Sequence, residues 1–399
     1  MTATAIGASV ALPGTVLAKP PTAEVNTTGL AVTDDTVKVG ILHSLTGTMA
    51  ISETGSVEAE KLAIEQINAM GGVLGRQIEV IVEDGASDWP TFAEKSRKLL
   101  VNDKVATVFG CWTSASRKAA LPVFEKENGL LYYPTFYEGL EQSKNVIYTG
   151  QEATQQILDG LNWVAKEKGA KTFYLIGSDY IWPRTSMKIA RKHIENVLGG
   201  SVVGEEYAPL GHTQFGSIIN KIRLKKPDVI YAAVVGGSNV AWFKQLKAAG
   251  ITGDKQTLLT ISVTEDEVLG IGGENLVGFY SIMKYFMSLD NANNAEFVKN
   301  FKAKWGADSV IGDVTQAAYL GPWLWKAAVE KAGSFDVDKV VAASPGIELT
   351  TAPEGYVKVH ENHHLWSKAR VAQWQADGQA KIVYESELIE PNPFPEGYQ

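Results

Sequence analysis

The fold is decided by the run Val37-Lys-Val-Gly-Ile-Leu42 and by Val57-Glu-Ala-Glu-Lys-Leu-Ala-Ile-Glu-Gln-Ile67, which ends at Gly71-Gly72. The first run is short and apolar, as expected of a buried strand. The second repeats its apolar residues at helical spacing, and the glycine pair stops it. A strand followed by a helix that returns over the sheet predicts an α/β unit with a parallel sheet.

The same order recurs along the chain in two series. In the first series, strands are predicted at 78–82, 105–109 and 130–133, and helices at 93–100 and 116–127. After Tyr148-Thr-Gly150 the order restarts, with helices predicted at 155–168, 187–197, 215–224 and 240–249 and strands at 172–176, 201–207, 229–235 and 258–261. Two series predict two doubly wound α/β lobes with helices on both faces of each sheet.

The last quarter of the chain has a different pattern. Helices are predicted at 295–305 and 315–332, and short alternating runs follow at 355–359, 369–374 and 380–384. Asp377-Gly378 between the last two runs is typical of a hairpin turn. The chain is therefore expected to end in antiparallel β structure packed on one lobe.

Composition limits the classes of function. The chain has 399 residues, a net charge of −8 and one cysteine. This length favours more than one domain, and the absence of a dense Lys/Arg block makes nucleic acid an unexpected partner. A single cysteine excludes an internal disulfide framework, and beyond the N-terminal leader no run reaches the ~18 apolar residues that span a bilayer.

The N-terminus resembles a targeting segment. Residues 5–18 are small and mildly apolar, and Val16-Leu17-Ala18 before Lys19 is similar to a cleavage site, although the basic start of a signal peptide is missing. We expect residues 1–36 to form a leader, of which the part from Pro20 onward is a flexible segment. An exported protein follows from this expectation.

Aromatic and polar side chains gather directly after the predicted strands. They lie in Gly110–Arg117, in Tyr132–Gly139 and in Gly177–Arg184. In open α/β sheets, ligands bind outside the carboxyl ends of the strands, and small-ligand pockets combine aromatic walls with a few polar groups. Core packing is the alternative role for these rings. The candidates are Trp112, Thr113, Ser114, Tyr133, Thr135, Tyr137, Glu138, Tyr180 and Trp182.

Two motifs suggest catalysis, and their context argues against it. His360-Glu-Asn-His-His364 matches the zinc-protease pattern, but that chemistry needs both histidines on one helix, and the flanking residues alternate like strands. Cys111 ends an apolar strand with His43 as its nearest predicted base, and a buried thiol is the simpler expectation. Thr264-Glu-Asp-Glu267 reads as a helix capping box, which leaves Glu265 free to face a cleft.

Several of these motifs together resemble a known family. Lys38-Val-Gly-Ile-Leu-His-Ser-Leu-Thr-Gly47, Ala63-Ile-Glu-Gln-Ile-Asn-Ala-Met-Gly-Gly72 and Gly75-Arg76 are similar to type I periplasmic binding proteins of the leucine/amide branch. The resemblance extends from Val37 to about Tyr384. The three aromatic stretches, and Asn362-His-His364, resemble the short-chain amide and urea subgroup. Phe136 and Trp182 depart from the pattern of its amide sensor.

The resemblance implies two Rossmann-like lobes joined by three crossover segments, near 150–153, 281–283 and 345–350. Lobe 1 then takes residues 37–152 and 283–347, and lobe 2 takes 153–282 and 348–399. Trp112, Thr113, Ser114, Tyr133, Thr135, Tyr180 and Trp182 carry over as ligand contacts, and Tyr137 and Glu138 belong to the motif but can lie one layer behind. Val235, Gly236 and Glu265 are the second-lobe candidates on weaker matches.

The expected function is capture rather than catalysis. The resemblance implies a periplasmic protein that binds urea or a short-chain amide by hinge closure and delivers it to the permease of an ABC importer, with no cofactor and no metal. Urea offers four N–H donors and one carbonyl acceptor. A cytoplasmic amide-sensing regulator and a branched-chain amino-acid binder remain alternatives, as does a zinc hydrolase.

Overall fold

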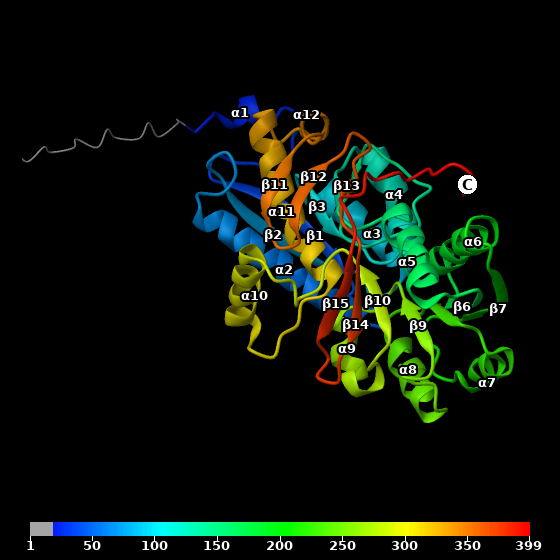
Figure 1. The fold of residues 1–399 in the computed structure, drawn as a ribbon. Helices are drawn as coiled ribbons and strands as arrows, with labels where there is room; N and C mark the ends of the chain where they lie inside the picture. Colours follow the sequence, from blue (N-terminus) through cyan, green and yellow to red (C-terminus); the bar gives the residue numbers. More distant parts are fainter. Residues whose placement is uncertain (1–18) are drawn as a thin grey trace, which may run out of the picture.

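A computed structural model describes residues 19–399, which form two α/β lobes side by side (Figure 1). The expected cleavage site at 16–18 lies outside the described residues. Between Lys19 and Gln399, no helix is both long and apolar enough to cross a membrane. The type I periplasmic binding protein fold predicted from the sequence is present, with a sheet of mainly parallel strands at the centre of each lobe.

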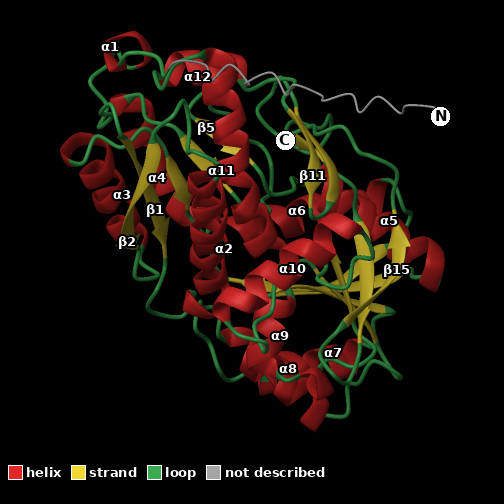
Figure 2. Ribbon diagram, turned by 90° about the vertical axis from the view of Figure 1, so that its left-hand side faces the viewer, coloured by secondary structure: helices red, strands yellow, loops and turns green. Residues whose placement is uncertain are grey.

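Lobe 1 is built on a parallel sheet with the order β2-β1-β3-β4-β5. Its strands are β1 (Thr36–His43), β2 (Gln77–Asp84), β3 (Val108–Gly110), β4 (Leu131–Tyr133) and β5 (Val146–Tyr148). Helices α2 (Ala50–Ala69) and α11 (Asp313–Ala332) pack together on one face, and α3 (Trp89–Arg97) and α4 (Ser114–Glu127) cover the other (Figure 2). A π-helical turn (Lys98–Asn102) extends α3, and α10 (Ala292–Trp305) and α12 (Val337–Ala343) complete the lobe.

Lobe 2 is built on a mixed sheet with the order β15-β14-β10-β9-β8-β6-β7. The strands are β6 (Thr172–Ser178), β7 (Ser201–Ala208), β8 (Val229–Ala233), β9 (Thr257–Thr260), β10 (Tyr280–Met283), β14 (Arg370–Trp374) and β15 (Ala380–Glu385). The helices are α5 (Asp159–Lys168), which continues a π-helical turn at Thr154–Leu158, α6 (Ile181–Asn196), α7 (Gly216–Lys225), α8 (Ser238–Ala248), α9 (Glu265–Ile271) and a 3₁₀ turn at Gly273–Asn275. Strands β14 and β15 form the predicted hairpin around Asp377-Gly378, and β14 pairs antiparallel with β10.

The third crossover lies later in the chain than the sequence suggested. The expected crossing at 345–350 is replaced by the sheet β11 (Glu348–Ala352), β12 (Gly355–Val359) and β13 (Leu365–Trp366), which packs on lobe 1. His364 bridges to Tyr148 of β5, and Val357 and Leu365 share a core with Ile41 of β1. The chain therefore enters lobe 2 near Ser367, and residues 348–366 belong with lobe 1 rather than with lobe 2.

The residues from Lys19 to Asp35 are also part of lobe 1, although the sequence suggested a flexible leader there. Arg76 donates to the carbonyl oxygen of Pro20, and Thr27 donates through its amide (2.8 Å) and its hydroxyl (2.6 Å) to the carboxylate of Asp336. The Val25 side chain is buried, and α1 (Thr22–Val25) lies beside α12 (Figure 1). Lobe 1 is thus closed by contacts between residues more than 300 positions apart.

The two lobes meet directly, in a closed arrangement. The amide of Gly237 in lobe 2 donates to the carbonyl oxygen of Thr48 in lobe 1 (3.0 Å). One cluster of buried side chains continues from lobe 1 into lobe 2. It runs, for example, from Phe124 of α4 through Trp112 and Trp182 to Ile189 of α6. The surface between the lobes is therefore largely apolar and packed.

Candidate functional site

A sharp turn after β3 places the first predicted binding segment at the edge of lobe 1. Gly110 has a φ of +142°, and a Cβ there would lie 2.1 Å from the carbonyl oxygen of Leu42, so only glycine fits. Cys111 follows at a φ of +71°. The thiol is buried, which raises its pKa and favours the protonated form, as expected of a buried thiol. The turn directs Trp112 toward lobe 2 and lets Thr113 cap α4 by accepting from Ala115 N (3.2 Å).

Aromatic rings from both lobes form a continuous strip across the boundary between the lobes. The strip consists of Trp89, Tyr180, Trp182, Phe136 and Trp112, with successive ring centroids 6.1, 6.4, 5.4 and 5.7 Å apart. Tyr180 and Trp182 come from the start of α6 in lobe 2, Trp89 is the first residue of α3 in lobe 1, and Trp112 and Phe136 come from loops of lobe 1. The structure thus brings three of the predicted residues together, and it adds Trp89 and Phe136.

A polar cluster lies beside the strip in lobe 1. The hydroxyl of Ser114 donates to Oε2 of Glu138 (2.6 Å), and Nη1 of Arg117 donates to the same hydroxyl (3.3 Å). The guanidinium of Arg117 is 4.6 Å from the ring centroids of both Tyr133 and Tyr137. Arg117 also binds Glu141 (2.6 Å), and despite burial it lowers the pKa of that carboxyl to about 2. The charge of this buried cation is therefore already balanced.

Tyr180 of lobe 2 lies close enough to this cluster to interact with its charged groups. Burial raises the pKa of Tyr180, and negative charge on Tyr133 and Glu138 raises it further by repulsion. Within residues 19–399, the Tyr133 hydroxyl, Oε1 of Glu138 and Nε1 of Trp182 are buried and have no hydrogen-bond partner. These atoms form a set of donors and acceptors beside the aromatic strip.

A buried histidine with two glutamates lies at the end of β1, and the sequence analysis did not place it in the site. His43 contacts Glu53 through Nδ1 (3.3 Å) and Glu60 through Nε2 (3.0 Å). Burial opposes a charge on His43, but Glu60 and Glu53 raise its pKa to about 10. Oε1 of Glu53 has no partner among the described residues. The seven-residue spacing of the two glutamates, two helical turns, was the signal that could have shown them on one face of α2.

The histidine motif near the C-terminus packs against Tyr137 and Tyr148 of lobe 1. His360 and His364 lie in the turn between β12 and β13, so the predicted hairpin is confirmed. Their rings diverge: His360 contacts Glu390 (3.0 Å), whereas His364 is fully buried, stacks on Tyr148 at 4.3 Å and contacts the Tyr137 hydroxyl. A solvated hairpin was expected here, but the burial of His364 shows that the turn is only partly solvated. No group of three or more His, Cys, Asp or Glu side chains in residues 19–399 is arranged to hold a metal ion.

Burial of His364 gives a testable pH dependence of stability. Burial lowers the pKa of His364 to about 3, below the usual value of 6.5. Between these two values the unfolded chain binds a proton that the folded protein does not, so stability falls as the pH is lowered from 6.5 toward 3. We expect the wild type to lose about 1.4 kcal/mol per pH unit more than His364→Phe, which keeps a ring in the stack. Calorimetric unfolding at pH 7, 6, 5 and 4 measures this slope, and parallel curves would contradict the assignment.

The remaining predicted residues have local partners. The Thr135 hydroxyl donates to the carbonyl oxygen of Cys111 (3.1 Å), and the Val235 amide donates to the Ser178 hydroxyl (3.1 Å). Gly236 lies against lobe 1, where a Cβ would be 2.7 Å from the Thr48 carbonyl oxygen. Glu265 Oε1 accepts from the amide of Met287 (2.8 Å), at the second crossover, which leaves its Oε2 without a partner among the described residues.

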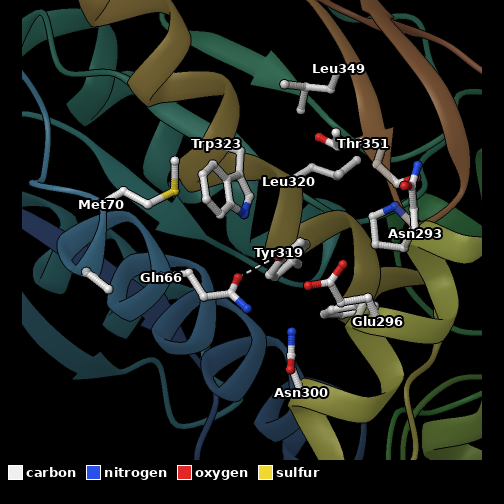
Figure 3. A pocket seen from close by; sticks show the side chains of 14 residues that line it. Gln66, Met70, Asn293, Glu296, Asn300, Tyr319, Leu320, Trp323, Leu349 and Thr351 are labelled. Atoms are coloured by element: carbon white, nitrogen blue, oxygen red, sulfur yellow. Dashed lines mark hydrogen bonds between the residues drawn. The ribbon is translucent and has the colours of Figure 1, made fainter. Parts of the chain in front are cut away.

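A separate groove of about 450 Å³ lies on lobe 1, between α2, α10, α11 and β11 (Figure 3). Tyr319 and Trp323 form one wall, and the Tyr319 hydroxyl donates to Oε1 of Gln66 (2.6 Å). None of the residues predicted as ligand contacts lines this groove. It is therefore distinct from the aromatic strip between the lobes.

Comparison with known proteins places the chain in a family. A model of the periplasmic binding protein domain matches residues 37–399. The leucine-, isoleucine-, valine-, threonine- and alanine-binding protein of Pseudomonas aeruginosa is 27% identical over 348 residues, which cover 86% of this chain and 91% of that protein.

Solved structures share the same fold. A solute-binding protein of an ABC transporter from R. palustris, in complex with 4-hydroxybenzoate, matches with a TM-score of 0.80 at 23% identity, over 90% of this chain and 98% of that one. A branched-chain amino-acid transporter substrate-binding protein from Streptococcus pneumoniae, in complex with isoleucine, matches with a TM-score of 0.77 at 22% identity, over 90% of this chain and 100% of that one. The chain belongs to the periplasmic binding protein family and has its type I fold.

Proposed function

We propose that this protein captures urea or a short-chain amide between its two lobes and delivers it to the permease of an ABC importer, from a periplasmic location. The aromatic strip contributed by both lobes carries this proposal, because it offers flat apolar walls for a small planar molecule. The family match and the expected leader support the location and the transport partner. A ligand that contacts both lobes stabilises the closed arrangement.

The polar atoms beside the strip complement an amide. Urea presents four N–H donors, which Oε1 of Glu138 and Oε1 of Glu53 are suited to accept. Its carbonyl oxygen needs donors, and the Tyr133 hydroxyl and Nε1 of Trp182 are available for that role. Hydrogen bonds to charged groups contribute about 1.5–3 kcal/mol each. A few of them, with stacking, support a micromolar dissociation constant, about −8 kcal/mol.

The charge of the site disfavours carboxylate ligands. The 4-hydroxybenzoate and isoleucine bound by the two structural neighbours both carry a carboxylate. Here the Ser114 hydroxyl is hydrogen-bonded to the Glu138 carboxylate, and Arg117 is paired with Glu141. A ligand carboxylate beside Ser114 would face Glu138, and like charges at short range repel strongly in a buried site. This distinguishes the proposal from a branched-chain amino-acid binder.

One calorimetric panel tests the proposed ligand class. The wild type is titrated with urea, acetamide, formamide, acetate, leucine and 4-hydroxybenzoate. We expect heat from urea and the two amides and none from the three carboxylate-bearing compounds. Tight binding of leucine or 4-hydroxybenzoate would overturn the proposal, and cell fractionation separates a periplasmic binding protein from a cytoplasmic amide sensor.

The variant Glu138→Gln separates the effect of the negative charge of Glu138 from the effect of the size of its side chain. Glutamine keeps the size and one acceptor but loses the charge, so the urea dissociation constant is expected to rise about tenfold. Acetate has the shape of acetamide and a negative charge, and we expect it to bind the variant detectably. Glu125→Gln, on the exposed side of α4, is the matched control and leaves both affinities unchanged. An unaltered urea affinity in Glu138→Gln would remove this residue from the site.

A further inference from the structure

The first turn of α9 in lobe 2 contacts lobe 1 away from the aromatic strip. Asp266 Oδ2 accepts two hydrogen bonds there, from the amide of Gly312 (3.0 Å) and from the hydroxyl of Thr315 (2.9 Å). Gly312 is the N-cap of α11, and Thr315 lies in its first turn. A carboxylate at this place also meets the positive end of a 20-residue helix.

The surfaces at this contact fit closely. A Cβ on Gly312 would lie 2.2 Å from Oγ1 of Thr264 and 2.3 Å from Oδ2 of Asp266, across the lobe boundary. Gly55 of α2 completes the contact, because a Cβ there would lie 3.0 Å from Oδ1 of Asp266. The backbone of Gly312 (φ −86°, ψ 176°) is one that any residue adopts. The glycine is therefore required by the approach of lobe 2 and not by its own conformation.

We propose that Asp266 is a latch that holds the two lobes closed through the N-terminus of α11, without touching the ligand. The inference rests on the proposed function to the extent that closure accompanies ligand capture. Asp266 then acts as a positioning residue: it adds to the stability of the closed arrangement, and so to affinity, whichever planar ligand the strip receives. Glu265, its neighbour, makes a similar bond to the Met287 amide at the crossover.

A double-mutant cycle on urea binding tests the latch. Asp266→Ala and Thr315→Val each remove one side of the same contact, and each is expected to weaken urea binding, Asp266→Ala by about tenfold (about 1.4 kcal/mol). The double variant should lose less than the product of the two single losses, because the partners share one interaction. Asp254→Ala, which removes an exposed carboxylate of lobe 2 bonded to Thr252, is the control without effect. Strictly multiplicative losses would overturn the latch.

Hydrogen exchange gives an arm that uses no ligand, so it remains valid if urea proves to be the wrong ligand. The Gly312 amide is bonded to Asp266, whereas the Gln316 amide is bonded within α11 to the Gly312 carbonyl oxygen (3.0 Å). In Asp266→Ala, the Gly312 amide should exchange at least several-fold faster while the Gln316 amide keeps its rate. Equal rates for Gly312 in wild type and variant would overturn the proposal, and so would a joint acceleration of both amides, which indicates fraying of α11.

Discussion

Replacing Arg117 with alanine is expected to lower the free energy of unfolding by about 3–5 kcal/mol, because the substitution leaves buried carboxylates without their cation. Arg117 is fully buried, binds Glu141 at 2.6 Å and lies 3.8 Å from Glu138. Its guanidinium also packs against the rings of Tyr133 and Tyr137, so the variant loses packing as well as charge. For a chain of this length the loss corresponds to a drop in Tm of about 4–6 °C.

Thermal unfolding is the suitable measurement, because urea and guanidinium resemble the proposed ligand. Arg191→Ala is the matched control: Arg191 is a partly exposed arginine of α6 that pairs with Glu195 and Glu205. Such pairs contribute about 0–1 kcal/mol, so its Tm should stay within about 1 °C of wild type. A drop of the same small size for Arg117→Ala would show that the Glu138–Glu141 pair does not depend on this cation.

Trp182→Ala is expected to weaken urea binding by about 30-fold to 900-fold. Trp182 lies 5.4 Å from Phe136 in lobe 1 and 6.4 Å from Tyr180 in its own lobe, at the middle of the aromatic strip. Removing a central buried tryptophan from a binding surface typically costs about 2–4 kcal/mol. The variant also loses the indole N–H proposed to donate to the urea carbonyl.

Two further variants make this result specific. Trp182→Phe keeps a ring against Phe136 and should recover most of the lost affinity, with the remainder reporting the indole N–H. Ile181→Ala removes an exposed side chain one position earlier and should bind urea like wild type. If Trp182→Ala binds urea normally while its Tm falls, the ring belongs to the core between the lobes and not to the ligand site.

The lobes themselves could be predicted because their signals are local. The strand at 37–42 and the helix at 57–67 each repeat with their own period, and the structure places β1 and α2 there. The third crossover could not be predicted in the same way. The alternation at 355–359 shows which side chains of a strand are buried, but it does not show which lobe buries them. Only the contacts of Val357 and Leu365 with the core of lobe 1 decide this.

The sequence was sufficient to predict which loops carry the candidate side chains, but not which hydrogen bonds those side chains form. The position of Trp112 and Trp182 after strand ends predicted that both lie near the facing lobe, and both belong to the aromatic strip at the lobe boundary. Thr113 and Thr135 lie in the same loops, yet their hydroxyls are used by the local backbone, as the cap of α4 and as a donor to Cys111. Glu53 was missed because its proximity to the cleft depends on how α2 packs against β1. The seven-residue spacing of Glu53 and Glu60 places both on one face of α2, but it does not show that this face meets His43.

The hydrogen bonds between Thr27 and Asp336 join residues that are synthesised at very different times. They can form only after Asp336 has been added to the chain. Lobe 1 needs residues from both ends of the chain, so its core cannot be completed before about residue 366 has left the ribosome. At about 5–20 residues per second, most of the chain exists for tens of seconds without a finished lobe. Until then the unfinished lobe exposes apolar side chains that the complete lobe buries, and such surface makes partly folded chains prone to aggregation.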